Sequence, residues 1–411
     1  MEGSILAELG LLKVAIVHDW LTSPGGAERV LEQMIEVFPT ADVFTVCDFL
    51  PEKHRHLLHH KQPKTTFIQK IPFARKHYRV YLPLMAFAIE QFDLEGYDLI
   101  LSSSYAVAKG VITGPDQLHI SYVHTPLRYA WHLQAQYLRE GSMDRSVASW
   151  LARLSLHYLR MWDVRSAAGV DIFLSNSRYV AAQVNRLYRR ESLILPPPVD
   201  IETLPYREEK EDFYLTVSRL VPYKRVELIV RAFARTPNRR LVVAGDGPDR
   251  ARVEEAAKGY PNIEVIGYQP DEVLHDLMAR ARAFVFAAME DFGITPVEAQ
   301  ACGTPVIAFG KGGALESIRG KPHILNKTGV FFAEQTEGSI IAAVEYFERI
   351  ADTINPEDCR RNAERFSNSA FRRGLMAIVS EGIDSAARDE DHPSFFEQGS
   401  PIPILVQRKN A

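Results

Sequence analysis

Two acidic and two basic residues have spacings that suit the binding of a ligand. Glu290 and Glu298 are separated by seven residues in the stretch EDFGITPVEAQACGTPVIAF, and Arg219 and Lys224 stand five positions apart in SRLVPYK. Ionised carboxylates only accept hydrogen bonds, so the glutamates suit sugar or ribose hydroxyls and would repel phosphate. A phosphate group requires cations, which the arginine and the lysine supply. Together these residues predict a site for a ligand with both hydroxyl and phosphate groups.

The second glutamate also belongs to a predicted helix start. Thr295-Pro296-Val297-Glu298 has the residue types of a helix N-terminus, with Thr295 as N-cap and Glu298 as a capping-box carboxylate. Gly303 is expected to end this helix. The backbone N–H groups of Gly293 and Ile294 would lie at the positive end of the helix dipole, where an anion or sugar hydroxyls can bind. On its own, Glu298 suits either a helix cap or a ligand-binding group.

The elements that position these residues begin with an apolar run, KVAIV at 13–17, followed by the turn Pro24-Gly25-Gly26 and an amphipathic helix. A strand, a glycine turn and a helix open a parallel α/β unit. Further strands of this half are predicted at residues 43–46, 99–102, 120–123 and 172–174. Three consecutive prolines near residues 195–205 cannot continue a helix or a central strand, so they predict a hinge.

After the hinge the alternation of strands and helices resumes, with the predicted strand FYLTVSRL, a helix at 224–234, and the strands RLVVAGDGP and AFVFAA. Short apolar runs that alternate with amphipathic helices predict a second doubly wound domain. The fold class is therefore α/β, with two doubly wound sheets. Ligands of such sheets bind at the carboxyl ends of the strands, which is where Arg219 and Lys224 fall.

The composition limits the class of protein. A chain of 411 residues exceeds one ordinary core, so two domains are expected. The formal net charge of −4 argues against a general nucleic-acid binder. The three cysteines form no CxxC pair, which argues against a disulfide framework or a zinc site and favours a reduced, cytoplasmic setting. The first residues lack the features of a signal peptide, and no apolar run is long enough to span a membrane.

Taken in order, the motifs resemble family 4 of the retaining glycosyltransferases, which have the GT-B fold of two facing Rossmann-like domains with a cleft between them. The resemblance covers nearly the whole chain. It rests on Gly25-Gly26 after the first strand, His124 in SYVHTP, the pair in SRLVPYK, the turn GDGP at 245–248, and the Glu-x7-Glu motif.

The resemblance implies an acceptor-side domain at 11–200 and a nucleotide-sugar-binding domain at 206–366. A crossover helix at about 367–385 would pack back onto the first domain. The remaining tail, 386–411, is expected to be poorly ordered.

The resemblance also implies a role for each site residue. Arg219 and Lys224 would hold the diphosphate of a nucleotide sugar and stabilise its charge as it leaves. Glu298 would bind the ribose hydroxyls, and Glu290 and His124 would bind the transferred sugar. Further donor-binding groups are expected at Gly25, Gly26, Gly245, Asp246, Gly247, Tyr268, Phe292, Gly293, Ile294 and Thr295.

Within the family, the stretches VHDWL, YLPLMAFAIEQF and HTPLRYAW most resemble bacterial mannosyltransferases of O-antigen and exopolysaccharide assembly. This resemblance implies GDP-mannose as donor and a glycan or lipid-pyrophosphate-linked acceptor, with no cofactor. The one D-x-D string lies in the charged tail, so catalysis without a metal is expected. The alternatives are a UDP-sugar-dependent glucosyl- or N-acetylglucosaminyltransferase, a sugar-nucleotide epimerase of the same fold, and a non-catalytic nucleotide-sugar-binding scaffold.

The segment at 64–88, KTTFIQKIPFARKHYRVYLPLMAFA, combines cations with aromatic and aliphatic side chains. Such a segment suits peripheral contact with an anionic membrane, here the inner face of the plasma membrane, or with a lipid-pyrophosphate acceptor. The alternative is a partly buried helix with a solvated basic face.

Overall fold

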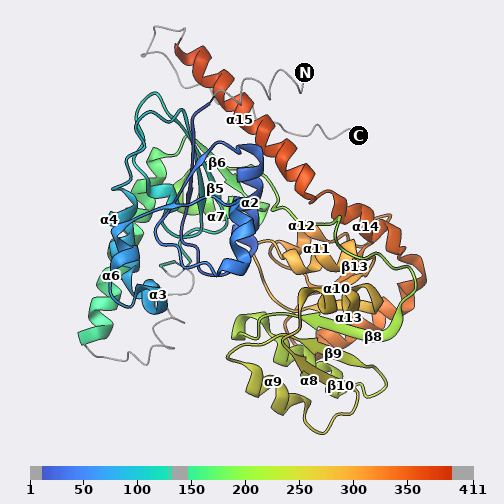
Figure 1. Ribbon diagram of the computed structural model, residues 1–411. Coiled ribbons are helices and arrows are strands. Elements are labelled where there is room, and N and C mark those ends of the chain that lie inside the picture. Colours follow the sequence, from blue (N-terminus) through green and yellow to red (C-terminus); the bar gives the residue numbers. More distant parts are fainter. Residues whose placement is uncertain (1–11, 129, 132–146, 391–411) are drawn as a thin grey trace.

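The computed structural model describes residues 12–128, 130–131 and 147–390, which form two parallel β-sheets covered by helices (Figure 1). The first sheet has seven strands in the order β3-β2-β1-β4-β5-β6-β7. These strands are β1 (Val14–His18), β2 (Asp42–Thr45), β3 (Lys64–Thr65), β4 (Leu99–Ser104), β5 (Leu118–Val123), β6 (Ile172–Ser175) and β7 (Leu193–Ile194).

The central strand β1 is buried along its whole length, as is typical of a parallel strand with helices on both faces. It pairs in parallel with β2 and β4, so that His18 lies opposite Thr45 on one side and Ser103 on the other. Because every pair in this sheet is parallel, the carboxyl ends of the strands meet at one edge.

The helices of the first half, including short 3₁₀ helices labelled η, connect these strands. They are α2 (Gly26–Val37), η1 (Glu52–Leu58), η2 (Phe67–Lys70), α3 (Ala74–His77), η3 (Tyr78–Tyr81), α4 (Leu82–Ile89), η4 (Ala108–Gly110), α6 (Val147–Ser166), η5 (Ala167–Gly169) and α7 (Arg178–Tyr188).

The second sheet has six strands in the order β10-β9-β8-β11-β12-β13. They are β8 (Glu211–Val217), β9 (Leu241–Ala244), β10 (Ile263–Gly267), β11 (Ala281–Phe286), β12 (Val306–Phe309) and β13 (Gly329–Phe332). The accompanying helices are η6 (Pro222–Lys224), α8 (Val226–Ala234), α9 (Arg250–Ala257), α10 (Asp271–Arg280), α11 (Ile294–Ala301), α12 (Ala314–Ser317), α13 (Glu337–Ile350), η7 (Ala351–Thr353) and α14 (Pro356–Glu364). The two sheets confirm the predicted pair of doubly wound α/β units.

The last helix, α15 (Asn368–Glu390), leaves the second half and runs along the first (Figure 1). Phe371, Leu375 and Val379 are buried in the same core as β1 and α2. Arg372 Nη1 also donates to Gln33 Oε1 of α2 at 2.7 Å. The chain therefore connects the two halves twice, once near residue 200 and once at the start of α15.

Three elements differ from the sequence-based expectation. The helix expected at 224–234 begins at Val226, because Arg225 adopts a left-handed conformation with φ of 56° and Lys224 lies in a 3₁₀ turn. Residues 64–88 form a series of short elements rather than one helix, with Phe73 left-handed at φ 61°. The last helix continues to Glu390, past residue 385, and residues 391–411 of the expected tail lie outside the described part.

Candidate active site

Several predicted donor-binding residues lie in loops that follow β8, β9 and β10, and these loops are joined by hydrogen bonds. Ser218 N–H donates to Ala244 O at 3.1 Å, and Leu220 N–H donates to Asp246 O at 2.9 Å. Gly245 N–H donates to Gly267 O at 2.7 Å. The Arg219 loop, the GDGP turn and the end of β10 therefore form one bonded group at the carboxyl edge of the second sheet.

A glycine is required at position 245 for this arrangement. Gly245 has a φ of +132°, and a Cβ atom built on it would fall on the carbonyl oxygen of Ser218. Gly247 likewise lies against the Leu220 carbonyl, where a Cβ atom would also overlap. Asp246 points outward, accepts from the Gly247 N–H at 2.7 Å and faces Arg250. The turn is thus built against the loop that carries Arg219.

The two cations differ in their surroundings. The Arg219 side chain is exposed and has no ion pair or hydrogen bond with any other described residue. Lys224 is largely buried, pairs with the Glu290 carboxylate and lies 5.6 Å from the ring centroid of Tyr223. Burial and the positive charge of Arg128 lower the pKa of Lys224 to about 8. The structure therefore brings together one predicted phosphate ligand and one predicted sugar ligand.

The helix that carries Glu298 starts differently from the prediction. Its N-cap is Gly293, with a φ of +87°, so Thr295 lies within the first turn of α11 and the prediction of Thr295 as cap is wrong. The N–H groups of Gly293, Ile294 and Thr295 stand at this helix start, where no intrahelical acceptor exists for them. The predicted end is confirmed, because Gly303 follows α11 with a φ of +79°.

Phe292 contributes its backbone rather than its ring to this region. The side chain is buried and contacts Phe366, with ring centroids 5.3 Å apart at 73°. The ring anchors the loop between β11 and α11 in the core of the second half, and this places Glu290 and Gly293 on either side of it.

A glycine pair that the sequence analysis missed supports the same loop. Gly313 N–H donates to Glu290 O at 2.9 Å. A Cβ atom built on Gly313 would lie 2.2 Å from Cα of Phe292, and one on Gly312 would overlap Glu290 O. The position of the Glu290 carboxylate therefore depends on close backbone approach at residues 312–313.

The predicted glycine turn of the first half faces α11 across the boundary between the sheets. A Cβ atom built on Gly26 would lie 2.7 Å from Cδ1 of Ile294, and Gly25 is the N-cap of α2. One turn further along α2, Arg29 Nη1 donates to Glu298 Oε1 at 3.1 Å. The starts of α2 and α11 thus face each other, which brings Gly25 and Gly26 to the same boundary as Ile294 and Glu298.

Further contacts join the halves beside Glu290. Arg128 forms an ion pair with Asp291, and Ser177 Oγ donates to Asp291 O at 2.6 Å. At the start of α7, the Arg178 and Tyr179 N–H groups donate to the Glu316 carboxylate at 3.0 and 3.3 Å. The sequence carries no local signal for these residues, because each pairs with a partner more than a hundred positions away.

His124 lies directly after β5, at the carboxyl edge of the first sheet. It is half-buried, its Nε2 lies 2.9 Å from Ser103 Oγ, and its carbonyl accepts from Asn176 Nδ2 at 2.9 Å. Burial and the nearby His18 lower the pKa of His124 to about 3, so the ring is neutral near pH 7. A neutral imidazole can offer one donor and one acceptor to a ligand or to the protein.

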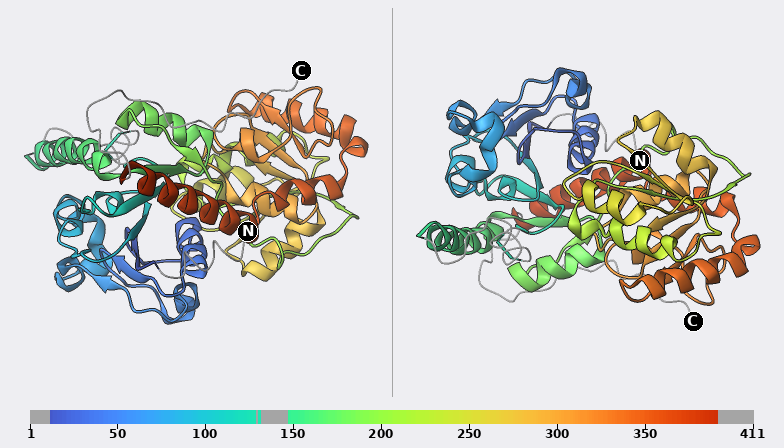
Figure 2. Two further views of the ribbon diagram at one scale, coloured as in Figure 1. Left: turned by 90° about the horizontal axis from the view of Figure 1, so that it is seen from above. Right: turned by 90° about the horizontal axis from the view of Figure 1, so that it is seen from below.

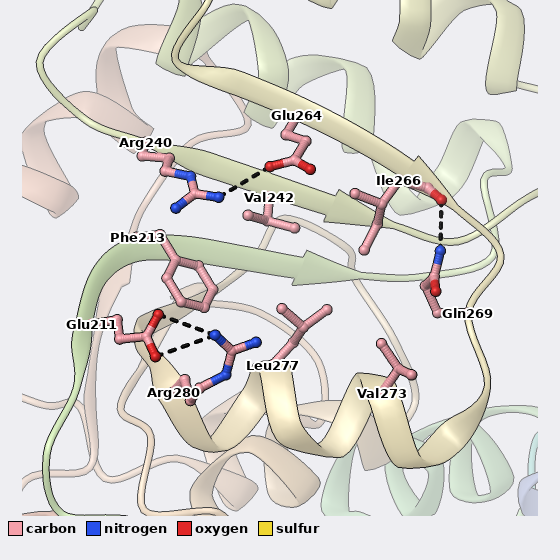
Figure 3. A pocket seen from close by; sticks show the side chains of 10 residues that line it. All are labelled: Glu211, Phe213, Arg240, Val242, Glu264, Ile266, Gln269, Val273, Leu277 and Arg280. Carbon is pink, nitrogen blue, oxygen red and sulfur yellow. Dashed lines mark hydrogen bonds and ion pairs between the residues drawn. The ribbon is translucent and has the colours of Figure 1, made fainter.

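Tyr268, at the end of β10, is 73% exposed and so contacts little of the protein. A separate cavity of about 240 Å³ lies between strands β8–β10 and α10 (Figure 3). Its rim charges pair with each other, Arg240 with Glu264 and Arg280 with Glu211. None of the predicted site residues lines this cavity.

The comparisons with known proteins agree with this arrangement. Residues 24–203 match the family described as Glycosyltransferase Family 4, and residues 205–366 match the family described as Glycosyl transferases group 1. The first match covers the first sheet from α2 onward, and the second covers the whole second sheet.

The curated relatives match a shorter stretch. The chain is 28% identical over 159 residues to one subunit of a phosphatidylinositol N-acetylglucosaminyltransferase of Arabidopsis thaliana, covering 37% of this chain and 34% of that protein. It is also 28% identical over 173 residues to a D-inositol 3-phosphate glycosyltransferase of Mycobacterium sp., covering 36% of this chain and 39% of that protein. The match thus spans little more than a third of these relatives' length.

Solved structures resemble the chain over most of its length. Anabaena Alr3699/HepE in complex with UDP superposes with a TM-score of 0.61 at 19% identity, covering 90% of this chain and all of that one. A glycosyltransferase from Rickettsia africae superposes with a TM-score of 0.57 at 16% identity, covering 90% of this chain and 99% of that one. These likenesses show the fold. The chain has the GT-B fold, and each of its halves matches the model of a glycosyltransferase family.

Proposed function

We propose that the protein is a retaining glycosyltransferase that moves a sugar from a nucleotide diphosphate donor to a glycan or a lipid-linked oligosaccharide. The observation that carries this proposal is the meeting of Lys224 with Glu290 beside the facing starts of α2 and α11. A diphosphate joined to two sugars requires cations and helix N-termini for its phosphates, and groups that accept hydrogen bonds from its sugar hydroxyls. Arg219 and Lys224 would hold the diphosphate, and Glu298 would bind the ribose.

In the reaction, the bond from the sugar anomeric carbon to the diphosphate oxygen breaks, and a bond from that carbon to an acceptor hydroxyl oxygen forms. The hydroxyl proton passes to the leaving diphosphate, and no protein base is assigned. Negative charge grows on the leaving oxygens, where fixed cations and N–H groups have their largest effect. Glu290 and His124 would hold the sugar while this bond breaks.

We propose GDP-mannose as the donor, on the resemblance to bacterial mannosyltransferases. The alternative is a UDP-sugar, and one observation favours it. Anabaena Alr3699/HepE was solved in complex with UDP-glucose, and it superposes on this chain with a TM-score of 0.59.

The proposal is tested by following donor turnover. GDP-mannose or UDP-glucose is incubated with the protein and a bacterial lipid-linked oligosaccharide fraction, nucleoside diphosphate is quantified, and the anomeric configuration of the product is read by NMR. We expect diphosphate release that depends on the acceptor, with the donor configuration retained. Inversion would contradict the retaining mechanism. Epimerised donor without an acceptor would support the epimerase, and no turnover with any donor would favour the scaffold.

Nucleotide binding should weaken at alkaline pH. Because the pKa of Lys224 is about 8 without ligand, its ammonium group is charged at pH 7 and loses its proton as the pH rises through 8. We expect the Kd for GDP or UDP, measured by calorimetry, to rise by about 5-fold between pH 7 and pH 9. The Lys224→Arg variant stays charged over this range and should show a flatter profile. Equal slopes in both proteins would rule out Lys224 as the titrating group.

We also propose that the first half docks on an anionic membrane through residues 64–88 and the adjacent helix α6. We call this surface the basic apolar face. Among the described residues no helix is both long and apolar enough to cross a bilayer. The apolar side chains exposed on this face are Phe67, Phe73, Val80, Leu84 and Phe87 from the first segment and Trp150, Leu151, Leu154, Tyr158 and Met161 from α6.

The positive charge of the basic apolar face favours binding to anionic lipids. The segment at 64–88 contains no acidic residue, and it exposes Lys70, Arg75, Lys76 and Arg79. The one acidic residue of α6, Asp163, is buried and pairs with Lys109 at 2.7 Å, which fixes the helix on the domain. Figure 2 shows α6 at the end of the molecule away from the second sheet. The face therefore presents apolar and basic groups together, as interfacial surfaces do.

Vesicle flotation tests this docking. We expect the protein to float with vesicles of phosphatidylcholine and phosphatidylglycerol but not with phosphatidylcholine alone. Replacing Trp150 and Leu154 with serine should lower the bound fraction at least about 10-fold, since each buried apolar side chain contributes about 1.5–3 kcal/mol. The matched control replaces Tyr260 and Tyr346, two exposed aromatic residues of the second half, with serine and should float normally. The proposal would be overturned if the protein failed to float with the anionic vesicles. It would also be overturned if the protein formed a dimer that the Trp150 and Leu154 substitutions dissociated.

A further inference from the structure

The start of α7 is hydrogen-bonded to both loops that carry the predicted sugar-binding residues, His124 and Glu290. On the side of the first half, Asn176 Nδ2 donates to His124 O at 2.9 Å. On the side of the second half, Ser177 Oγ donates at 2.6 Å to the carbonyl of Asp291, the residue that follows Glu290. Two neighbouring residues thus connect the His124 loop and the Glu290 loop across the boundary between the sheets.

A carboxylate of the second half adds a charged contact to the same helix start. The Arg178 N–H donates to Glu316 Oε2 at 3.0 Å, and the Tyr179 N–H donates to Oε1 at 3.3 Å. These N–H groups belong to the first turn of α7, where no intrahelical acceptor exists and where the helix dipole favours negative charge. The N-cap Ser177 accepts from the Val180 N–H. Glu316 therefore supplies acceptors that the helix and its cap do not.

The same glutamate is tied to Glu290 through the backbone of the second half. The Glu316 N–H donates to Gly313 O at 2.9 Å, and the Gly313 N–H donates to Glu290 O at 2.9 Å. Gly313 is buried against the Phe292 backbone, with no room for a Cβ atom. A movement of Glu316 away from α7 would therefore carry the Glu290 loop away from His124.

We propose that Glu316 is a positioning residue, whose bonds to the start of α7 hold the two halves in the orientation that lets Glu290 and His124 contact the same sugar. Because these two residues belong to different halves, contacts within one half cannot set the distance between them. Hydrogen bonds to an ionised carboxylate are stronger than those between neutral groups, which suits Glu316 to this task. The role in sugar transfer rests on the proposed function, whereas the contact between the halves follows from the hydrogen bonds alone.

The contact is tested by double electron–electron resonance on the full-length protein without nucleotide. Nitroxide labels are attached to Arg186→Cys on α7 and Glu345→Cys on α13, two exposed positions, and the three native cysteines are buried. We expect one narrow distance distribution, which becomes broader and longer on average when Glu316→Ala is added. An unchanged distribution after Glu316→Ala would overturn the inference, as would a broad distribution before it.

Two further variants separate this contact from general effects of losing a glutamate. Glu337 is half-buried and lies in the first turn of a helix, as Glu316 does, but it pairs with Arg235 of its own half at 3.4 Å. Glu337→Ala should therefore leave the label distances unchanged, and a broadening equal to that of Glu316→Ala would contradict the proposal. Glu316→Gln keeps one acceptor oxygen but no charge, so we expect an intermediate broadening. A broadening beyond that of Glu316→Ala would contradict the acceptor role.

Transfer kinetics then test the positioning role. Three predicted nucleotide-binding residues, Arg219, Lys224 and Glu298, lie together in the second half and keep their places when the halves separate. Glu316→Ala should therefore lower kcat about 10-fold while the Kd for GDP or UDP, measured by calorimetry, changes less than about 2-fold. Glu337→Ala should change neither quantity.

The outcomes distinguish this inference from the proposed function. An unchanged kcat in Glu316→Ala, or equal losses of kcat and nucleotide affinity, would overturn the positioning role. If the wild-type protein transfers no sugar from any donor, the proposed function fails, and the label distances still decide whether Glu316 joins the halves. If transfer occurs and the label distances do not respond to Glu316→Ala, this inference fails alone.

Discussion

Replacing Lys224 with alanine should lower the rate of sugar transfer by about 10²- to 10³-fold, the usual effect of removing one group that stabilises charge in a transition state. Lys224 stands at the end of the β8 loop, is largely buried, and already contacts the predicted sugar ligand Glu290. Its removal takes a cation from the place where the leaving diphosphate gains charge. Initial rates at saturating donor and acceptor give the comparison.

The fold should survive this change, because the Lys224 partner Glu290 remains partly accessible to water. The control is Lys258→Ala, which removes an exposed lysine of the same half whose one ion pair with a described residue is to Glu255, at 3.6 Å. It should transfer sugar at the wild-type rate, since exposed ion pairs contribute little. Near-normal turnover in Lys224→Ala would contradict the assignment of the diphosphate site.

Replacing Gly313 with alanine should lower both stability and activity. Its φ of −65° suits any residue, so the effect is steric: the new methyl group would lie 2.2 Å from the Phe292 backbone. We expect the free energy of unfolding to fall by about 1–3 kcal/mol, as overpacking in a tight contact does. The loop that carries Glu290 must shift, so transfer should fall by about 10-fold or more. Denaturant unfolding and initial rates measure the two effects.

Gly338→Ala is the matched control, because it makes the same chemical change where no atom lies within 4 Å of the new methyl group. Gly338 lies in the first turn of α13, where alanine should leave stability unchanged or raise it by up to about 1 kcal/mol. Wild-type stability and activity in Gly313→Ala would show that the Glu290 loop does not depend on close approach at residue 313.

Much of the fold could be predicted because its signals are local. The run KVAIV predicted a strand within one residue of β1, and Gly303 marked the end of α11. The start of α11 was predicted wrongly because Thr-Pro-Val-Glu has the composition of a cap, whereas the observed cap is Gly293, whose φ of +87° favours glycine. Residues 64–88 do not form one helix, since Phe73 adopts a left-handed conformation beside Pro72.

The candidate site, too, could be predicted only where its signals are local. Arg219, Lys224, Glu290 and Glu298 stand in short motifs, and the structure places Lys224 against Glu290. Their partners across the boundary, such as Arg29, lie up to 269 positions away and form no motif with them. Charge pairs of this kind depend on how the two sheets face each other, which no periodicity in the chain encodes.

The most direct test of the account is the thermal unfolding of the purified protein in the presence of GDP, UDP, ADP, GDP-mannose and UDP-glucose, each with and without EDTA. We predict stabilisation by GDP and GDP-mannose, unaffected by EDTA and lost in Lys224→Ala, because a ligand that binds only the folded state raises its stability. Stabilisation by UDP and UDP-glucose instead would still support a glycosyltransferase, but with a UDP-sugar rather than GDP-mannose as its donor. No stabilisation by any of these nucleotides would contradict a nucleotide-sugar site in this protein.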